Sequence, residues 1–258
     1  GIRDDLVTGV QTCALPIYEA YGGLGYGYTG LGVVMEEVGR RLTASPLQAS
    51  VLTGATLIQL AGNEEQKQAL LPSIAAGELS VTLALQEGPV HRPTMVGTTA
   101  TPTGSGYRLD GCKVMVLDAH VADTLIVVAR TSGEAGEEHG ISLFLVERST
   151  DGVTTDAAAM VDSRNAGEVT LTGVEVGSDA LLGELDAGFA PLAVEMEGAA
   201  FAQVCLDHGV AFAAVRTISD RADDTAHIDF QAFVSAVAGP RALAMISQLM
   251  LVLRAASG

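Results

Sequence analysis

Asp220 is the residue of the C-terminal region whose type and position could do chemistry. It follows an apolar run, Phe212–Ile218, that is predicted to form a buried strand. A carboxylic acid at the end of a strand and beside a helix can give a proton to a bound ligand and so make a better leaving group. The pattern alone leaves an alternative open, because Asp220 and Asp223 are also what a solvated acidic loop contains.

The histidines and cysteines predict less chemistry. His91 and His120 are interpreted as solvated loop residues rather than as ligands or bases. The cysteines have neither the spacing of a metal site nor that of a disulfide framework, so we expect buried, reduced thiols and no metal. They are Cys13, Cys112 and Cys205.

The charge balance excludes several classes of partner. The 258 residues carry a net charge of −17 at pH 7, and the sequence pI is near 4.5. So acidic a chain repels nucleic-acid phosphates and anionic membrane surfaces. No apolar run reaches the roughly 18 residues that a membrane span needs. Residues 1–17 also lack the basic start and apolar core of a signal peptide. We therefore expect a cytoplasmic protein that binds neither nucleic acid nor membrane.

Helical sequence comes before the centre of the chain. A glycine-rich stretch at 22–32 contains G-x-G spacings, but no strand precedes it, so it does not predict a dinucleotide-binding fingerprint. The segment Pro46 to Ala61 is almost wholly apolar and predicts a buried helix, and Asn63 is a good N-cap for the next one. Three helices with short loops predict an antiparallel layer. The first of them has an apolar face formed by Leu31, Val34, Met35 and Val38.

The segment Gly106–Arg130 predicts three consecutive β-strands. Its first part alternates apolar and polar residues up to a turn predicted at Asp110-Gly111. An extended apolar run follows up to Asp118, where a second turn is predicted. Residues 124–129 then form an apolar run rich in β-branched side chains. These strands are predicted to form the middle layer of the protein, between two different helical regions.

Three sequence fragments become specific when they are taken in order. They are YGGLG, EEVGRR and GNEEQKQALLPSIAAGE. Their order and spacing resemble the N-terminal helical domain of the acyl-CoA dehydrogenase family. The resemblance implies an α+β fold, with a partial, antiparallel helical layer at 18–79 and a β-barrel-like sheet domain at 80–188. The segments that resemble the family's middle domain are Leu83–Glu87, Gly106–Arg130, Gly140–Glu147 and Glu168–Glu184.

The resemblance also implies a cofactor and a substrate. Acyl-CoA dehydrogenases remove the α-proton of an acyl-CoA thioester with a carboxylate base and pass a β-hydride to FAD, so FAD and acyl-CoA are implied here. The family contacts the flavin through two segments usually written L-T-E-P and W-I-T-N. Their counterparts in this chain are Leu85, Gln86 and Glu87 for the first and Met115, Val116 and Leu117 for the second.

Both flavin segments depart from the family pattern. Gln86 places an amide where the family has a hydroxyl, and Met115 and Leu117 stand where the family has an aromatic wall and a hydroxyl near the flavin N5. Gln86 can still donate a hydrogen bond, whereas Leu117 cannot. Two interpretations stay open: a divergent flavoprotein with altered FAD contacts, or the non-catalytic subunit of a heteromeric acyl-CoA dehydrogenase. Either implies a homo- or hetero-oligomer of such chains.

The residues at 189–258 resemble a second family. The pattern VEMEGAA-x-AQVC followed by VR-x-ISD-x-AD is similar to the C-terminal part of 5′-methylthioadenosine/S-adenosylhomocysteine nucleosidases. This region predicts an α/β helix-strand-helix unit. The resemblance implies that Asp220 protonates the purine N7 and that Glu197 binds the ribose hydroxyls. The other substrate-binding positions that it implies are Glu195, Met196, Arg216 and Ser219.

The two resemblances together predict a mosaic of incomplete folds. Residues 1–17 resemble translated sequencing-adaptor read-through and are treated as a non-native or disordered segment. The helical domain that supplies the base in most acyl-CoA dehydrogenases has no counterpart at 189–258, and the nucleosidase's early glutamate has none either. We therefore expect an acyl-CoA dehydrogenase-like flavoprotein fragment that is inactive alone. An assembly error near 187–193, rather than a natural fusion, would join it to the nucleosidase-like piece.

Overall fold

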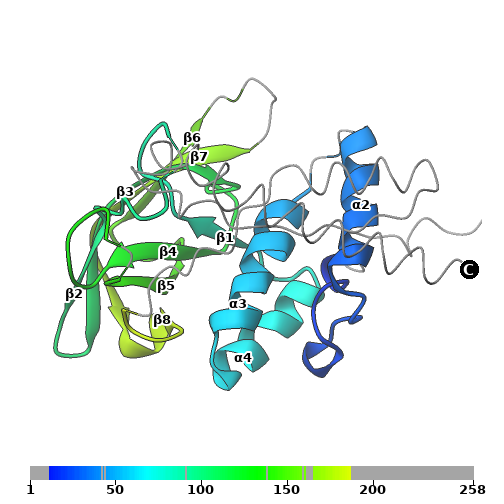
Figure 1. Ribbon diagram of the computed structural model, residues 1–258, viewed down its shortest axis with the longest axis horizontal. Coiled ribbons are helices and arrows are strands. Elements are labelled where there is room, and N and C mark those ends of the chain that lie inside the picture. Colours follow the sequence, from blue (N-terminus) through cyan, green and yellow to red (C-terminus); the bar gives the residue numbers. More distant parts are fainter. Residues whose placement is uncertain are drawn as a thin grey trace, which may run out of the picture. The chain divides into compact units, whose positions relative to one another are not determined.

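A computed structural model describes residues 12–41, 43, 45–90, 92–137, 139–158, 160 and 165–186. The chain divides into two units at Phe189/Ala190, and the described residues all belong to the first. The predicted join and the helix-strand-helix unit at 189–258 lie outside the described residues. So do His91 and Cys205. Figure 1 shows α2, α3 and α4 gathered on one side of the strands.

The helical layer forms where the sequence predicts it, with one difference in its geometry. The segment predicted as a single buried helix begins as a π-helix, η3, and continues directly as the α-helix α3. π-Helices are rare and frequently lie at functional sites. The helical elements are η2 (Glu19–Tyr21), α2 (Gly27–Arg41), η3 (Leu47–Ala55), α3 (Thr56–Ala61) and α4 (Glu64–Ala75).

A capping box begins α4, as the sequence predicts for Asn63. The Asn63 side chain accepts a hydrogen bond from the Gln66 N–H at 2.8 Å, and the Gln66 side chain accepts one from the Asn63 N–H at 3.1 Å. This pairing satisfies two N–H groups that the helix itself leaves without partners. The Gln66 amide also donates to the carbonyls of Asp179 and Leu181, and so ties α4 to the end of the sheet domain.

The predicted apolar face of α2 packs as expected. Leu31 is buried in a small cluster with Leu47, Val51 and Cys13. The other three residues of the predicted face, Val34, Met35 and Val38, pack against this cluster.

The strands form one eight-stranded mixed sheet in the order β6-β7-β3-β2-β4-β5-β8, and β1 pairs in parallel with β4. The neighbouring pairs β3/β7, β4/β5 and β6/β7 are antiparallel. The observed α+β fold confirms the predicted class for the described residues. The strands are β1 (Val81–Ala84), β2 (Thr99–Pro102), β3 (Gly106–Leu117), β4 (Thr124–Arg130), β5 (Ile141–Glu147), β6 (Val153–Ala158), β7 (Ala166–Gly177) and β8 (Leu181–Leu182).

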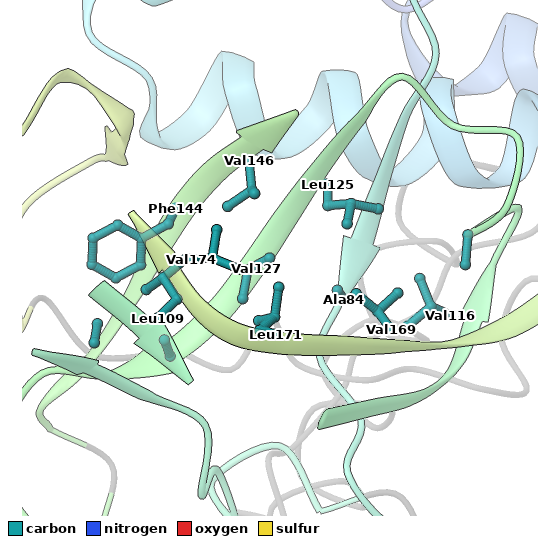
Figure 2. Packing of buried hydrophobic residues seen from close by; sticks show 13 residues of the cluster. Ala84, Leu109, Val116, Leu125, Val127, Phe144, Val146, Val169, Leu171 and Val174 are labelled. Carbon is teal, nitrogen blue, oxygen red and sulfur yellow. The ribbon is translucent and has the colours of Figure 1, made fainter. Parts of the chain in front are cut away.

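β4 is buried along its whole length because both of its faces carry a core. Side chains of β4 and β5 pack against side chains of β3 and β7, so the sheet encloses its own core, as the predicted β-barrel-like domain would. Phe144 and Leu109 lie at one end of this cluster, and Ala84 and Val116 lie at the other (Figure 2). On the opposite face, Ile126 joins a second cluster with the helices. The helical layer and the sheet therefore share a core.

A buried arginine fastens two loops at the end of β4. The Arg130 side chain is 7% exposed, and its five N–H groups donate to five main-chain carbonyls. All of its donors are therefore satisfied without a carboxylate. The carbonyls belong to Thr94, Val96, Ser132, Glu137 and His139.

Two sequence expectations differ from the structure. β3 runs without a turn through Asp110-Gly111, because the glycine lets the strand pass close to Thr98: a Cβ at Gly111 would lie 2.4 Å from the Thr98 hydroxyl. Residues 12–17 were expected to be disordered or non-native, yet Ala14 and Ile17 are buried in the core that the helices share with the sheet. Apolar side chains placed here complete that core.

Candidate functional site

A hollow of about 170 Å³ lies where the helical layer meets the sheet. Three elements line it: the π-helix η3, strand β1 with the loop that follows it, and the distorted end of β3. Apart from the hydroxyls of Thr53 and Thr82 and the amide of Gln86, the lining side chains are apolar, which is typical of a small-molecule site. The lining residues are Ala49, Thr53, Thr82, Leu83, Leu85, Gln86, Val114, Met115 and Leu117.

The main chain of β3 is distorted where it borders the hollow. The pairing of β3 with β7 shifts register between Lys113 and Val116, as at a β-bulge. Met115 has a φ of 54° inside this irregularity and is 47% exposed, whereas Val116 is 2% exposed and belongs to the core of the sheet. The adjacent residues Val114 and Met115 therefore both line the hollow, together with Leu117, while Val116 lies in the core of the sheet.

Hydrogen bonds fix the opposite wall. The Gln86 carbonyl accepts from the Val114 N–H at 2.7 Å, which joins the two walls directly. The Gln86 side-chain Nε2 donates to the Gly88 carbonyl at 2.8 Å. The Thr82 hydroxyl donates to the Leu117 carbonyl at 2.6 Å, so its hydrogen bond joins two residues of the lining.

A buried ion pair lies behind both walls. Lys113 Nζ is 2.6 Å from Glu87 Oε1 and donates to the Leu85 carbonyl at 3.2 Å. The Lys113 side chain is fully buried, and that of Glu87 is 18% exposed. Glu87 also accepts from the N–H groups of Gly97 and Thr98 at 2.6 and 2.9 Å. The carboxylate thus has a partner on each oxygen.

The pKa values of this pair follow from burial and contact. Burial raises the pKa of Glu87, but hydrogen bonds from Lys113 and Thr98 and the charge of Lys113 outweigh it, so the net shift is downward. Burial lowers the pKa of Lys113, and its contacts with Glu87 offset this shift only in part. The Glu87 carboxylate is therefore held in its ionised form.

The structure brings together four of the six residues predicted to contact a cofactor. Leu85, Gln86, Met115 and Leu117 line the hollow, although the two segments are far apart in the sequence. Glu87 and Val116 do not line it, because the first pairs with Lys113 and the second lies in the core of the sheet. The residues predicted for the nucleosidase-like site lie outside the described residues. They are Glu195, Met196, Glu197, Arg216, Ser219 and Asp220.

Sequence reasoning missed several residues of the site. Lys113 carried a usable signal, because a lysine at an inward position of an apolar strand is buried only when it is paired. Ala49 and Thr53 carried no such signal in the sequence, since their place at the hollow follows from the π-helical path of η3.

Two residues outside the hollow differ from their sequence expectations. His120 was expected to be solvated, but its Nδ1 is buried and has no hydrogen-bond partner in the described structure. Cys112 was expected to be buried and is exposed.

The residues at the hollow fit the ring of a flavin. The apolar side chains of Leu83, Val114 and Leu117 offer surface for a flat ring, and Met115 adds a thioether at the rim. An amide nitrogen carries two N–H groups, so the bond from Gln86 to Gly88 leaves a second donor for a ring heteroatom. The lining is thus compatible with the flavin ring of FAD, held through packing and a small number of polar contacts.

The described part of the chain lacks two further features. No group of three or more histidine, cysteine or acidic residues there could hold a metal ion. Within the same residues, no helix is long and apolar enough to cross a membrane.

Three family models match successive parts of the chain. Residues 9–78 match "Acyl-CoA dehydrogenase, N-terminal domain", and residues 90–174 match "Acyl-CoA dehydrogenase, middle domain". Residues 172–250 match "Phosphorylase superfamily". The last match begins inside the sheet domain, within β7.

Individual relatives agree with the first two matches. An acyl-CoA dehydrogenase of Bacillus subtilis is 30% identical in an alignment of 219 positions that covers 78% of this chain and 57% of that protein. The ChsE4-ChsE5 complex of Mycobacterium tuberculosis is 29% identical with a TM-score of 0.60, over 67% of this chain and 45% of that one. A glutaryl-CoA dehydrogenase of Mycobacterium smegmatis in complex with FADH2 is 25% identical with a TM-score of 0.62, over 69% and 46%. The chain spans less than two thirds of each of these relatives.

Proposed function

Because residues 9–78 and 90–174 carry the N-terminal and middle domains of the acyl-CoA dehydrogenase family, we propose that this chain binds FAD at the hollow and serves the α,β-dehydrogenation of an acyl-CoA thioester. The observation that carries the proposal is the meeting of Leu85 and Gln86 with Met115 and Leu117 in one hollow. The mycobacterial glutaryl-CoA dehydrogenase of similar fold was solved with FADH2.

The residues of the hollow have separate roles in this proposal. FAD supplies the acceptor for a hydride from the β-carbon of the substrate. Leu83, Val114 and Leu117 pack on the ring and keep water from it, while the Gln86 amide donates a hydrogen bond to its polar edge. The hollow thus binds and orients.

The lining of the hollow has no group that could remove the α-proton. None of its nine residues carries a carboxylate or another side chain that ionises as a base near neutral pH. We therefore expect the base to come from another chain. The missing base favours a hetero-oligomer, in which a second chain supplies it. A protein of similar fold was solved as the ChsE4-ChsE5 complex.

The binding of FAD can be tested with one matched pair of variants. Gln86→Leu keeps the size of the side chain and removes its donor, so FAD affinity is expected to fall about tenfold, the worth of one hydrogen bond. Gln68→Leu makes the same change on the exposed face of α4, outside the hollow, and is expected to leave affinity unchanged. Flavin fluorescence titration of the 258-residue chain measures both.

The same preparation is expected to reduce no dye when acyl-CoA is added, because the hollow lacks a base. A folded, colourless protein that takes up no added FAD would contradict the proposal. Turnover of acyl-CoA by this chain alone would contradict the need for another chain.

The match of residues 172–250 to the Phosphorylase superfamily raises the question of a second activity, nucleoside hydrolysis. We infer that this region is related to the nucleosidases but hydrolyses no adenosyl thioether by itself. The helix-strand-helix unit that the sequence predicts for 189–258 is too small to complete a sheet around a substrate. An assay of adenine release from methylthioadenosine is expected to read zero. Release that Asp220→Asn abolishes would overturn this inference.

A further inference from the structure

The Lys113–Glu87 pair lies next in sequence to residues on both walls of the hollow. Glu87 follows Gln86, and Lys113 precedes Val114 and Met115. Neither charged residue lines the hollow itself. The pair is therefore one residue away from each wall and can act on a ligand only through its neighbours.

The contacts of the pair hold the two walls at a fixed separation. Lys113 Nζ bonds to the carbonyl of Leu85 and to the carboxylate of Glu87, on the two sides of Gln86. The Gln86 carbonyl in turn accepts from the Val114 N–H. The strand end and the loop are thus joined by three bonds within a few residues.

Glu87 extends this connection to a third segment. Its two oxygens accept the N–H groups of Gly97 and Thr98, which precede β2. The Glu87 carboxylate therefore links the wall that contains Gln86 to two other segments. It contacts β3 through Lys113, and it contacts the residues that precede β2 through the N–H groups of Gly97 and Thr98. An apolar replacement of similar volume fills the space but supplies none of these directional contacts.

We propose that Lys113 and Glu87 are positioning residues of the hollow, which set the orientation of Gln86 and the distorted Val114–Met115 step against a bound ring. The inference rests on the proposed function, because the ring is that of FAD. It assigns the pair no contact with the cofactor. Binding sites held by such supporting contacts lose affinity when the support is removed, even though every contacting residue remains.

The test is the variant Lys113→Met in the 258-residue chain. It keeps an unbranched side chain of similar length and removes the donor to Leu85 and Glu87. We expect FAD affinity to fall about tenfold or more, as for the loss of a direct hydrogen bond. The matched control is Phe144→Ala, which weakens the core at the end of the cluster away from Ala84 and Val116 (Figure 2). Its FAD affinity is expected to equal that of the parent chain.

A second measurement does not depend on FAD. Amide hydrogen exchange reports local opening, and Lys113→Met is expected to speed exchange at Val114 more than at the amides of α4. A general loss of stability would speed both, as expected for Phe144→Ala. If the parent chain binds no FAD, the proposed function fails and exchange alone decides the positioning role. The positioning role is overturned if Lys113→Met and Phe144→Ala have the same FAD affinity and the same pattern of amide exchange.

Discussion

Replacing Glu87 with glutamine is expected to lower the free energy of unfolding by about 3–5 kcal/mol, the cost of leaving one charge of a buried pair without its partner. Lys113 is fully buried, and the substitution would leave its ammonium with neutral acceptors alone, such as the Leu85 carbonyl at 3.2 Å. Part of the loss comes from the N–H groups of Gly97 and Thr98, which would then share one carbonyl oxygen instead of two carboxylate oxygens. Urea unfolding followed by circular dichroism measures the change.

The double variant Glu87→Gln, Lys113→Met separates the charge from the shape. It removes both charges, so its loss of stability is expected to be well below the sum of the two single losses. Additive single losses would show that the two side chains do not act as a pair.

The acid dependence of stability gives an independent check on Glu87. Its pKa in the folded protein lies below the ordinary value of 4.5, so its stabilising contribution is complete above that pH. The contribution is lost as the pH falls through the lower, folded-state pKa. Glu87→Gln should therefore unfold with a flatter dependence on pH in this acid range than the parent chain.

Phe144→Ala is expected to cost about 3–5 kcal/mol, because it leaves a cavity in a core that aliphatic side chains otherwise fill. Phe144 is 0% exposed, and its ring lies 4.9 Å from that of Tyr107, centroid to centroid, at an angle of 58°. The cluster around it consists largely of valine, leucine and alanine. Neighbours of this size cannot extend to fill a space the size of a phenyl ring, so the cavity persists.

The control for Phe144 is Tyr26→Ala, which truncates an aromatic residue that is 67% exposed. Its cost is expected to lie within about 0.5 kcal/mol, as for most surface changes. Equal losses from the two variants would mean that the Phe144 side of the sheet carries no tightly packed core. Chemical denaturation distinguishes these cases when both variants are fitted with the same m-value, the slope of the free energy of unfolding against denaturant concentration.

Local patterns in the sequence predicted the helices and the strands β3 and β4, whereas β1, β5 and β7 were indicated by the family resemblance. Asn63 predicted the start of α4 because a capping residue acts within one turn, and the apolar stripe of α2 predicted its buried face. The apolar, β-branched run at 124–129 predicted strand β4, which the structure shows to be buried along its whole length. These features depend on neighbours in the sequence, so a reading along the chain finds them.

The errors arose where distant segments decide the local structure. Asp110-Gly111 has the composition of a turn, but the close approach of Thr98 uses the glycine to keep β3 extended. Ala14 and Ile17 lie in a segment that resembles adaptor read-through and lacks a clear period, yet both pack in the core that the helices share with the sheet. The π-helical path of η3 likewise has no counterpart in the apolar pattern of its sequence.

The candidate site could be predicted as two separate segments, but not as a hollow. The flavin segments were found by resemblance, and the structure separates Leu85, Gln86, Met115 and Leu117, which line the hollow, from Glu87 and Val116, which do not. Val116 faces the core because it alternates with Met115 and Leu117 along β3, whereas the register shift lets the adjacent Val114 and Met115 both line the hollow. An alternating pattern cannot reveal such a shift before the pairing of β3 and β7 is known.

The hydrogen bonds of Arg130 imply that two parts of the sheet domain, the loops around Arg130 and the hollow, differ in their tolerance of low pH. Its five acceptors are peptide oxygens, which do not titrate, so protonation of carboxylates leaves this fastening intact. The salt link beside the hollow, by contrast, depends on an ionised Glu87. Acidification would therefore loosen the ligand-facing side of the domain while the loops anchored by the guanidinium stay in place.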